Sequence, residues 1–304
     1  MFLANAPAVK VDLMNLLDIL LSGLSTGSTY AIIALGYTMV YGIAKMLNFA
    51  HGDVIMVGGY SLFVATLLPH SNPLLALLIA IVCCTVVGVL IEKFAYKPLR
   101  GASPLAVLIT AIGMSYLLQS LAQIIFGSGQ EPVRLLQLGS FTIAGHTIQW
   151  NTIVTLICAA VIMAALTIFV KYTRIGRAMI AVSEDKGAAQ LMGINVNFII
   201  SVTFAIGSAL AAFAGFFTVI KSIPATNTMG ALPGIKAFTA AVIGGIGSIP
   251  GAMVGGILMG IVESIAQAYP AISPYTIAIE FSILIVILLV RPSGILGKKR
   301  REKV

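Results

Sequence analysis

The chain has 304 residues, of which 59% are hydrophobic and only 9% are charged. An ordinary soluble domain carries about 25% charged residues, so this composition excludes a soluble globular protein and predicts a polytopic membrane protein. The net charge of +8 does not indicate a nucleic-acid partner, because the basic residues stand at the C-terminus and in short loops between apolar segments. That distribution is how membrane proteins fix their orientation.

Apolar segments of membrane-spanning length follow one another along the whole chain. A helix needs about 20 apolar residues to cross a bilayer. Segments near that length are 15–40, 48–69, 74–94, 104–126, 151–171, 198–220, 231–248, 251–269 and 275–291. The seventh is the weakest, because it is short and contains a proline and several glycines. We predict an all-α polytopic membrane protein with one transmembrane domain, 1–304. The segments predict about nine crossings, and a number between roughly eight and ten is compatible with them.

The basic residues predict which ends of the spans face the cytoplasm. Most of the 18 Lys and Arg residues fall in the C-terminal tail and in the loops 41–47, 93–103, 171–197 and 248–250. Because successive spans cross in opposite directions, these loops lie on the same side of the membrane as the tail. Because Lys and Arg are retained inside, we predict an N-outside, C-inside protein whose residues 292–304 form a basic cytoplasmic tail.

The long outer loop, 127–150, alternates apolar and polar residues near its end. Gly145-His146 in the middle of this alternation is typical of a two-residue turn between strands. We therefore predict a short periplasmic hairpin with its turn at these two residues.

The long inner loop, 171–197, carries the signals of a short helix outside the lipid. Ser183 is a suitable N-cap, the acidic residues after it suit the positive end of a helix, and Gly193 suits its stop. We predict a cytoplasmic helix over 184–192.

One string matches a hydrolase motif. Residues 23–27, GLSTG, read as G-x-S-x-G, which in hydrolases places the serine on a strand-to-helix turn. Here the string lies in an apolar helical segment, and its small residues suit close helix packing in a membrane. We favour packing, and an intramembrane hydrolase that uses Ser25 stays the alternative.

Motifs for ATP hydrolysis and metal binding are missing. The pattern G-x-x-x-x-G-K-[ST] does not occur, and the nearest string, GILGK near the C-terminus, has the wrong spacing. Cys83, Cys84 and Cys158 lie in apolar segments without metal-ligand spacing. His70 and His146 fall in outer loops, where we expect no catalytic function. We predict no enzyme activity, no cofactor and no metal.

Glycines gather in the string GGIGSIPGAMVGGILMG, residues 244–260. Gly256 and Gly260 form a G-x-x-x-G pattern, which lets membrane helices approach closely. Two interpretations stay open: packing within one subunit, and a flexible or subunit-contacting element beside a pore.

Three carboxylates fall within or close to apolar segments: Asp53, Glu263 and Glu280. A charge exposed at the bilayer centre costs about 2.5–3.5 kcal/mol on insertion scales, so each should face protein or water. For Glu263 and Glu280 we favour structural hydrogen bonding over a pathway lining.

The string NFAHGD, which begins at Asn48, places a histidine and an aspartate two residues apart. At 100° per residue, one small and polar helix face holds Asn48, His51, Gly52 and Gly59. Asp53 points about 160° away from His51 on the same helix, so we predict that the two do not act as a pair. We expect Asn48 to be the N-cap and Asp53 to anchor the inner end of the span. Two interfacial polar residues without a transport role are the other interpretation.

Four strings resemble the LivH-type permeases of bacterial ABC importers for branched-chain amino acids. They are GLSTGSTYAIIALGYTMVYGIAKMLNFAHGDVIMVGGY at 23–60, GRAMIAVSEDKGAAQLMGIN at 176–195, GIKAFTAAVIGGIGSIPGAMVGGILMGIVES at 234–264 and PSGILG at 292–297. The resemblance covers nearly the whole chain in the family's order, and its motifs are specific to the family rather than to one substrate.

This resemblance implies a function and a set of partners. Permeases of the family pair with a second related permease and are driven by two cytoplasmic ABC ATPases. A periplasmic binding protein delivers leucine, isoleucine or valine to them at the bacterial inner membrane. Relatives of the same architecture carry urea, short amides or other amino acids, so the substrate and homo- or heterodimeric pairing stay open. The implied fold is similar to that of the vitamin B12 importer permease.

The resemblance also implies site residues. The inner loop matches the family's coupling element, which implies ATPase contact through Glu184, Asp185, Ala188, Ala189 and Gly193. Because the binding protein selects the ligand, the pathway need only be weakly attractive, and we expect the polar face that begins at Asn48 to border it. The alternative function is an ion-coupled secondary transporter of small amino acids or amides, which the membrane carboxylates would suit.

Overall fold

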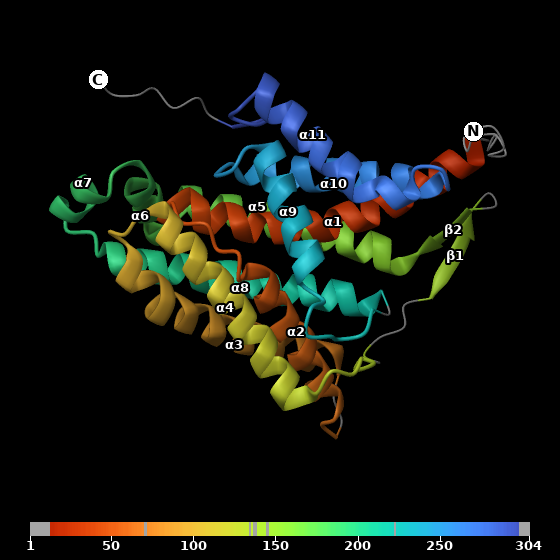
Figure 1. The fold of residues 1–304 in the computed structure, drawn as a ribbon, viewed down its shortest axis with the longest axis horizontal. Coiled ribbons are helices and arrows are strands. Elements are labelled where there is room, and N and C mark those ends of the chain that lie inside the picture. The colour runs from red at the N-terminus through yellow and green to blue at the C-terminus, as the bar shows by residue number, and fades with distance from the viewer. Residues whose placement is uncertain are drawn as a thin grey trace.

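The computed structural model describes residues 13–69, 72–133, 135, 139–143, 146–221 and 223–297. Within these ranges the chain is mainly helical, with one two-stranded hairpin (Figure 1). The predictions for His70, for the turn residue Gly145 and for the basic tail beyond residue 297 lie outside the described residues.

The elements follow the apolar segments of the sequence in order. The helices are α1 (Leu13–Ala44), α2 (His51–Thr66), α3 (Pro73–Ile91), α4 (Pro104–Phe126), α5 (Trp150–Tyr172), α6 (Arg174–Glu184), α7 (Lys186–Leu191), α8 (Val196–Ile220), α9 (Ala231–Gly244), α10 (Ile249–Ala268) and α11 (Thr276–Val290). A π-helical turn (Glu92–Tyr96) and a 3-10 turn (Lys97–Leu99) extend α3, and a second 3-10 turn (Ser273–Tyr275) precedes α11. The strands are β1 (Ser140–Ile143) and β2 (His146–Gln149).

Three membrane helices begin with the same sequence device. Asn72, Ser103 and Ser248 each accept a hydrogen bond from the backbone N–H three residues later, at the starts of α3, α4 and α10. A proline stands in the first turn of each helix. Backbone N–H groups there have no acceptor within the helix, so the missing N–H of proline costs no hydrogen bond. The helix starts are therefore set locally by a polar cap followed by proline.

Seven helices are long and apolar enough to cross a membrane, counting the described residues only. They include the long segment Pro73–Leu99, and they leave out α2 and α9, which have 16 and 14 residues. A full crossing takes about 20 residues, so the helical membrane class is confirmed while nine crossings and their orientation stay predictions.

Helix α1 runs through the middle of the fold and packs closely against α10 (Figure 1). A Cβ added at Gly260 would lie 2.1 Å from the backbone N of Gly27, and one added at Gly256 would lie 2.4 Å from the Cα of Ala31. The small residues of GLSTG thus form a helix contact, with Ser25 inside a helix rather than on a strand-to-helix turn.

The same glycine-rich string also joins α9 to α10. A Cβ on Gly255 would lie 2.0 Å from the carbonyl O of Ala240, and one on Gly244 would lie 1.9 Å from the carbonyl O of Gly251. This is the packing within one subunit that we predicted as one of two possibilities. Contact with another subunit stays a prediction.

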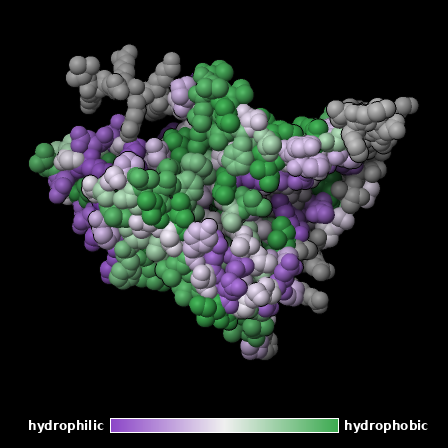
Figure 2. Space-filling model, in the orientation of Figure 1, coloured by the Kyte–Doolittle hydropathy of each residue, from purple (hydrophilic) through white to green (hydrophobic). Residues whose placement is uncertain are grey.

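Large apolar side chains cover much of the outside of the bundle. Leu74, Ile124, Ile125, Leu289 and Val290 are all strongly exposed, as expected for helices that face lipid or another membrane subunit. Figure 2 shows hydrophobic residues over α11 and along the lower edge of the view, and hydrophilic residues gathered at the end where α6 and α7 lie.

The hairpin forms within the long loop, one residue away from its predicted register. Ile143 pairs with His146, and Phe141 pairs with Ile148. His146 is therefore the first residue of β2 rather than part of the turn, which corrects the predicted turn at Gly145-His146. The reason is that the alternation of Phe141, Ile148 and their neighbours sets the pairing, and it leaves 144–145 as the connection.

Candidate functional site

The inner loop folds as two consecutive helices, α6 and α7. The Asp185 carboxylate accepts a hydrogen bond from the backbone N–H of Ala188 at 3.0 Å and caps α7. Ser183 lies inside α6, where its hydroxyl donates to the carbonyl O of Ile180 at 2.7 Å. The predicted single helix with Ser183 as N-cap is therefore wrong, because Asp185 adopts an extended conformation, φ −153°, and breaks the helix at that point. Gly193 ends the turn after α7 with φ +80°, as predicted.

The residues expected to meet an ATPase differ in exposure. Glu184, Asp185, Ala188 and Gly193 are exposed, whereas Ala189 is buried and faces the rest of the chain. Sequence reasoning missed two strongly exposed apolar residues: Leu191 is 90% exposed and Met192 is 83% exposed. The signal was available, because these are two large apolar residues directly before a helix-stop glycine in a polar loop.

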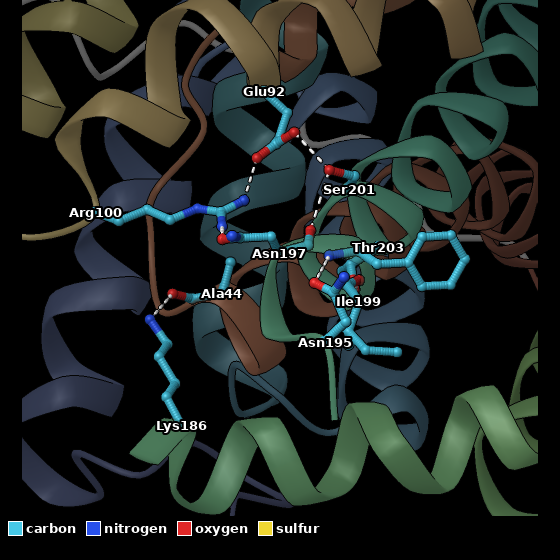
Figure 3. A network of polar contacts seen from close by, with 10 residues as sticks. Ala44, Glu92, Arg100, Lys186, Asn195, Asn197, Ile199, Ser201 and Thr203 are labelled. Atoms are coloured by element: carbon cyan, nitrogen blue, oxygen red, sulfur yellow. Dashed lines mark hydrogen bonds and ion pairs between the residues drawn. The ribbon is translucent and has the colours of Figure 1, made fainter. Parts of the chain in front are cut away.

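Helix α7 is tied to the end of α1 by a lysine. Lys186 Nζ donates to the carbonyl O of Ala44, the last residue of α1, at 2.9 Å (Figure 3). Burial, and then the positive charge of Arg100, lowers the pKa of Lys186. This bond connects the start of α7 directly to the end of the central helix.

A second polar network lies beside this contact (Figure 3). Arg100 forms an ion pair with Glu92 and donates to Asn197 Oδ1, and Ser201 Oγ donates to the second carboxylate oxygen of Glu92 at 2.7 Å. The network joins the end of α3 to the start of α8. Sequence reasoning counted Arg100 only as a loop charge, although an acid and an arginine eight residues apart follow a long apolar run there.

The polar face that begins at Asn48 is closely packed in this chain. Asn48 does not cap α2, because its side-chain O accepts a hydrogen bond from Tyr96 OH at 2.9 Å and Ala50 is the N-cap residue. His51 is buried edge-on against Tyr37, with ring centroids 4.7 Å apart. Its Nε2 has no hydrogen-bond partner among the described residues.

The two glycines of the face allow close approach of other segments. A Cβ on Gly52 would lie 2.6 Å from the carbonyl O of Gly230, and a Cβ on Gly59 would lie 2.4 Å from the Sδ of Met229. Both glycines thus place α2 against the segment that leads into α9.

Asp53 has partners different from those of His51. Its Oδ1 accepts a hydrogen bond from Gln119 Nε2 at 2.8 Å, and Gln119 also donates to Ser115 Oγ at 3.2 Å. The buried carboxylate therefore connects α2 to α4, while His51 faces α1. The two residues have separate neighbours, as the helix geometry predicted.

The other two membrane carboxylates share one lysine. Lys236 Nζ lies 2.7 Å from Glu263 Oε1 and 3.2 Å from Glu280 Oε1, so it joins α9, α10 and α11. Tyr30 OH donates to Glu263 Oε2 at 2.7 Å, and Gln267 Nε2 donates to Glu263 Oε1 at 3.0 Å. Within the described residues, no three His, Cys, Asp or Glu side chains gather as a metal site.

Comparison with known proteins places these elements in a family. A family model described as the permease component of branched-chain amino acid transport systems matches residues 19–290. A solved structure of an inward-facing ABC transporter of metal-chelate type has a TM-score of 0.49 at 16% identity, covering 89% of this chain and 85% of that one. The likeness to that structure is too weak for an inference.

Two curated relatives are similar over nearly their whole length. The high-affinity branched-chain amino acid permease BraD of Pseudomonas aeruginosa is 44% identical, covering 96% of this chain and 99% of its own. The corresponding permease LivH of Escherichia coli K12 is also 44% identical, covering 93% of this chain and 96% of its own. The resemblance of the sequence motifs is thereby confirmed: the chain belongs to the family of permease components of branched-chain amino acid transport systems.

Proposed function

We propose that this permease carries leucine, isoleucine or valine inward as one of two permease subunits of an ATP-driven importer. Its membership of the family makes it a multi-pass permease of the inner membrane. The proposed partners are a second related permease, two cytoplasmic ABC ATPases and a periplasmic binding protein. The observation that carries the proposal is α7, a capped helix bonded to the end of α1 and tipped by exposed Leu191 and Met192.

Reconstitution tests this function directly. The chain is placed in proteoliposomes with the neighbouring permease, ATPases and binding protein, and uptake of radiolabelled leucine is measured. We expect uptake that needs both ATP and the binding protein. Uptake that proceeds without them and collapses with an ionophore would instead support an ion-coupled secondary transporter.

We also propose nine crossings with the N-terminus outside, in a fold similar to the vitamin B12 importer permease. Support comes from the basic loops, and from the hydrophilic residues that gather at the end with α6 and α7 (Figure 2). The two short helices α2 and α9 would then cross with help from neighbouring helices. Because ATPases act in the cytoplasm, their binding to α7 tests the orientation as well.

We call the exposed residues between Glu184 and Gly193 the coupling surface, and this surface gives a mutational prediction. Glu184→Arg reverses an exposed charge beside α7, and Leu191→Asp places a charge on its apolar tip. We expect each to lower leucine uptake and ATPase co-purification by about fivefold or more, with normal membrane insertion, because docking needs a buried apolar anchor and matched charge. Lys97→Glu, at an exposed site in the 3-10 turn after α3, is the matched control. Normal transport by Glu184→Arg would count against this surface.

We propose that Asn48, His51, Gly52 and Gly59 border the translocation pathway. The supporting observation is the buried His51 Nε2, which lies beside Gly36 and has no hydrogen-bond partner in the described part of the chain. Relative movement of α1 and α2 would open this contact. We expect His51→Ala to lower the transport rate at normal assembly, whereas Asp53→Asn lowers the amount of assembled protein, because Asp53 connects α2 to α4. Equal, strong losses of rate in both variants at normal assembly would argue against this division.

A further inference from the structure

A polar pocket of about 370 Å³ opens at the end of the bundle where α1 begins. Asp18, Leu21, Ser22 and Ser25 line it from α1, Gln149 lines it from the end of β2, and Lys221 lines it from the residue after α8. Its volume falls in the range of small-molecule sites, about 300–1,000 Å³. Its described lining residues include none from α7 and none from the polar face of α2, so the pocket is separate from both.

Lys221 brings a positive charge to this pocket without a matching anion. Its Nζ donates to the carbonyl O of Ser25 at 3.0 Å and to Thr29 Oγ1 at 3.2 Å. No carboxylate lies within ion-pair distance of it among the described residues. The negative charge of Glu263 attracts Lys221 at longer range, but Glu263 forms its ion pair with Lys236. Two of the three ammonium donors have partners among the described residues, and a partly buried ammonium with a third donor to offer is suited to an incoming anion.

The same side of α1 presents the opposite charge. Asp18 and Ser25 are seven residues apart, which is about two turns and about 10.5 Å along one helix face. Ser22 stands between them, and Asp18 and Ser22 line the same pocket as Lys221. One small polar space therefore holds a carboxylate, an ammonium and hydroxyl groups, next to the apolar side chain of Leu21.

We propose that this pocket binds a zwitterionic amino acid at the outer mouth of the permease. The ligand carboxylate pairs with Lys221 Nζ, the ligand ammonium faces Asp18, and the aliphatic side chain packs against Leu21. This inference rests on the proposed function and its orientation. Ser25 lines this pocket and its carbonyl O accepts a hydrogen bond from Lys221 Nζ, so its role here is to position the lysine.

Photo-labelling of the assembled transporter tests the site. The complex of both permeases and the ATPases is incubated with the binding protein loaded with a diazirine analogue of leucine, irradiated and mapped by mass spectrometry. We expect label in α1 around Leu21. Lys221→Met should lower both this labelling and leucine uptake by about tenfold or more at normal assembly, since charge-assisted hydrogen bonds are the strong ones.

Two further variants separate charge from structure. Lys221→Arg keeps the cation and should retain most labelling and uptake, and Lys97→Met, an exposed lysine at a distant loop, should change neither. Equal leucine transport by the wild-type and Lys221→Met proteins would overturn the site. Labelling by the analogue that falls only on the binding protein, and not on the permease, would overturn it as well. Absence of ATP-dependent leucine uptake by the wild type would instead refute the proposed function.

Discussion

Replacing Lys236 with methionine is expected to lower the free energy of unfolding by about 3–5 kcal/mol, because it leaves two buried carboxylates without their cation. Glu263 and Glu280 approach Lys236 from different helices, at 2.7 and 3.2 Å. Glu280 is only 1% exposed, and no hydrogen bond from the described residues reaches its oxygens beyond this ion pair. The measurement is the fraction of protein that stays monodisperse in detergent after heating.

A second substitution shows whether the lost stability comes from the unpaired carboxylates. In Lys236→Met the added change Glu280→Gln removes one of the two unpaired charges, so we expect the double variant to recover part of the lost stability. Ser282→Ala on the same helix α11 removes only a hydroxyl bonded to the carbonyl O of Ala278, and it should stay close to wild type. A Lys236→Met protein as heat-stable as wild type would show that the cluster does not hold α9, α10 and α11 together.

Gly260→Val is the second change with a large expected effect, a loss of about 3 kcal/mol of stability through overpacking. Even the first carbon of the new side chain would lie 2.1 Å from the backbone N of Gly27. Backbone atoms cannot rotate away as a side chain can, so α1 and α10 must separate. The expected readouts are a lower melting temperature in detergent and less assembled protein in the membrane.

A matched control exists on α4. A Cβ built on Gly113 meets nothing within 4 Å, and the residue is exposed in a helix of the same apolar kind. Gly113→Val therefore has the same change in composition without the clash and should keep near wild-type stability. If both valine variants were equally stable, the α1–α10 contact would not depend on the absence of a side chain.

The sequence was most informative where local chemistry decides the structure. Each predicted apolar segment contains a helix, and Gly193 ends the turn after α7 as expected. Asn48 and Ser183 are residue types that suit caps, yet neither caps a helix. Tyr96, distant in sequence, occupies the side chain of Asn48, and Asp185 ends α6 two residues after Ser183.

Contacts between distant segments could not be read from the sequence. Nothing in the local pattern pairs Lys236 with carboxylates on two later helices, or brings Lys221 to the backbone of α1. Helical periodicity gives the face on which a residue lies, but the partner on that face depends on how the helices cross. The separation of His51 from Asp53 could be predicted because both lie on one helix, whereas Gln119 and Tyr37 as their neighbours could not.

Helix α1 has 32 residues without a break, which makes it about 48 Å long at 1.5 Å per residue. That exceeds the full thickness of a bilayer, about 40–45 Å. One of its ends accepts the bond from α7, and its other end lines the pocket with Lys221. Both ends belong to one unbroken helix. A rigid tilt of α1 that moves Ala44 would therefore also displace Asp18 and Ser25, without any relay of side-chain movements between them.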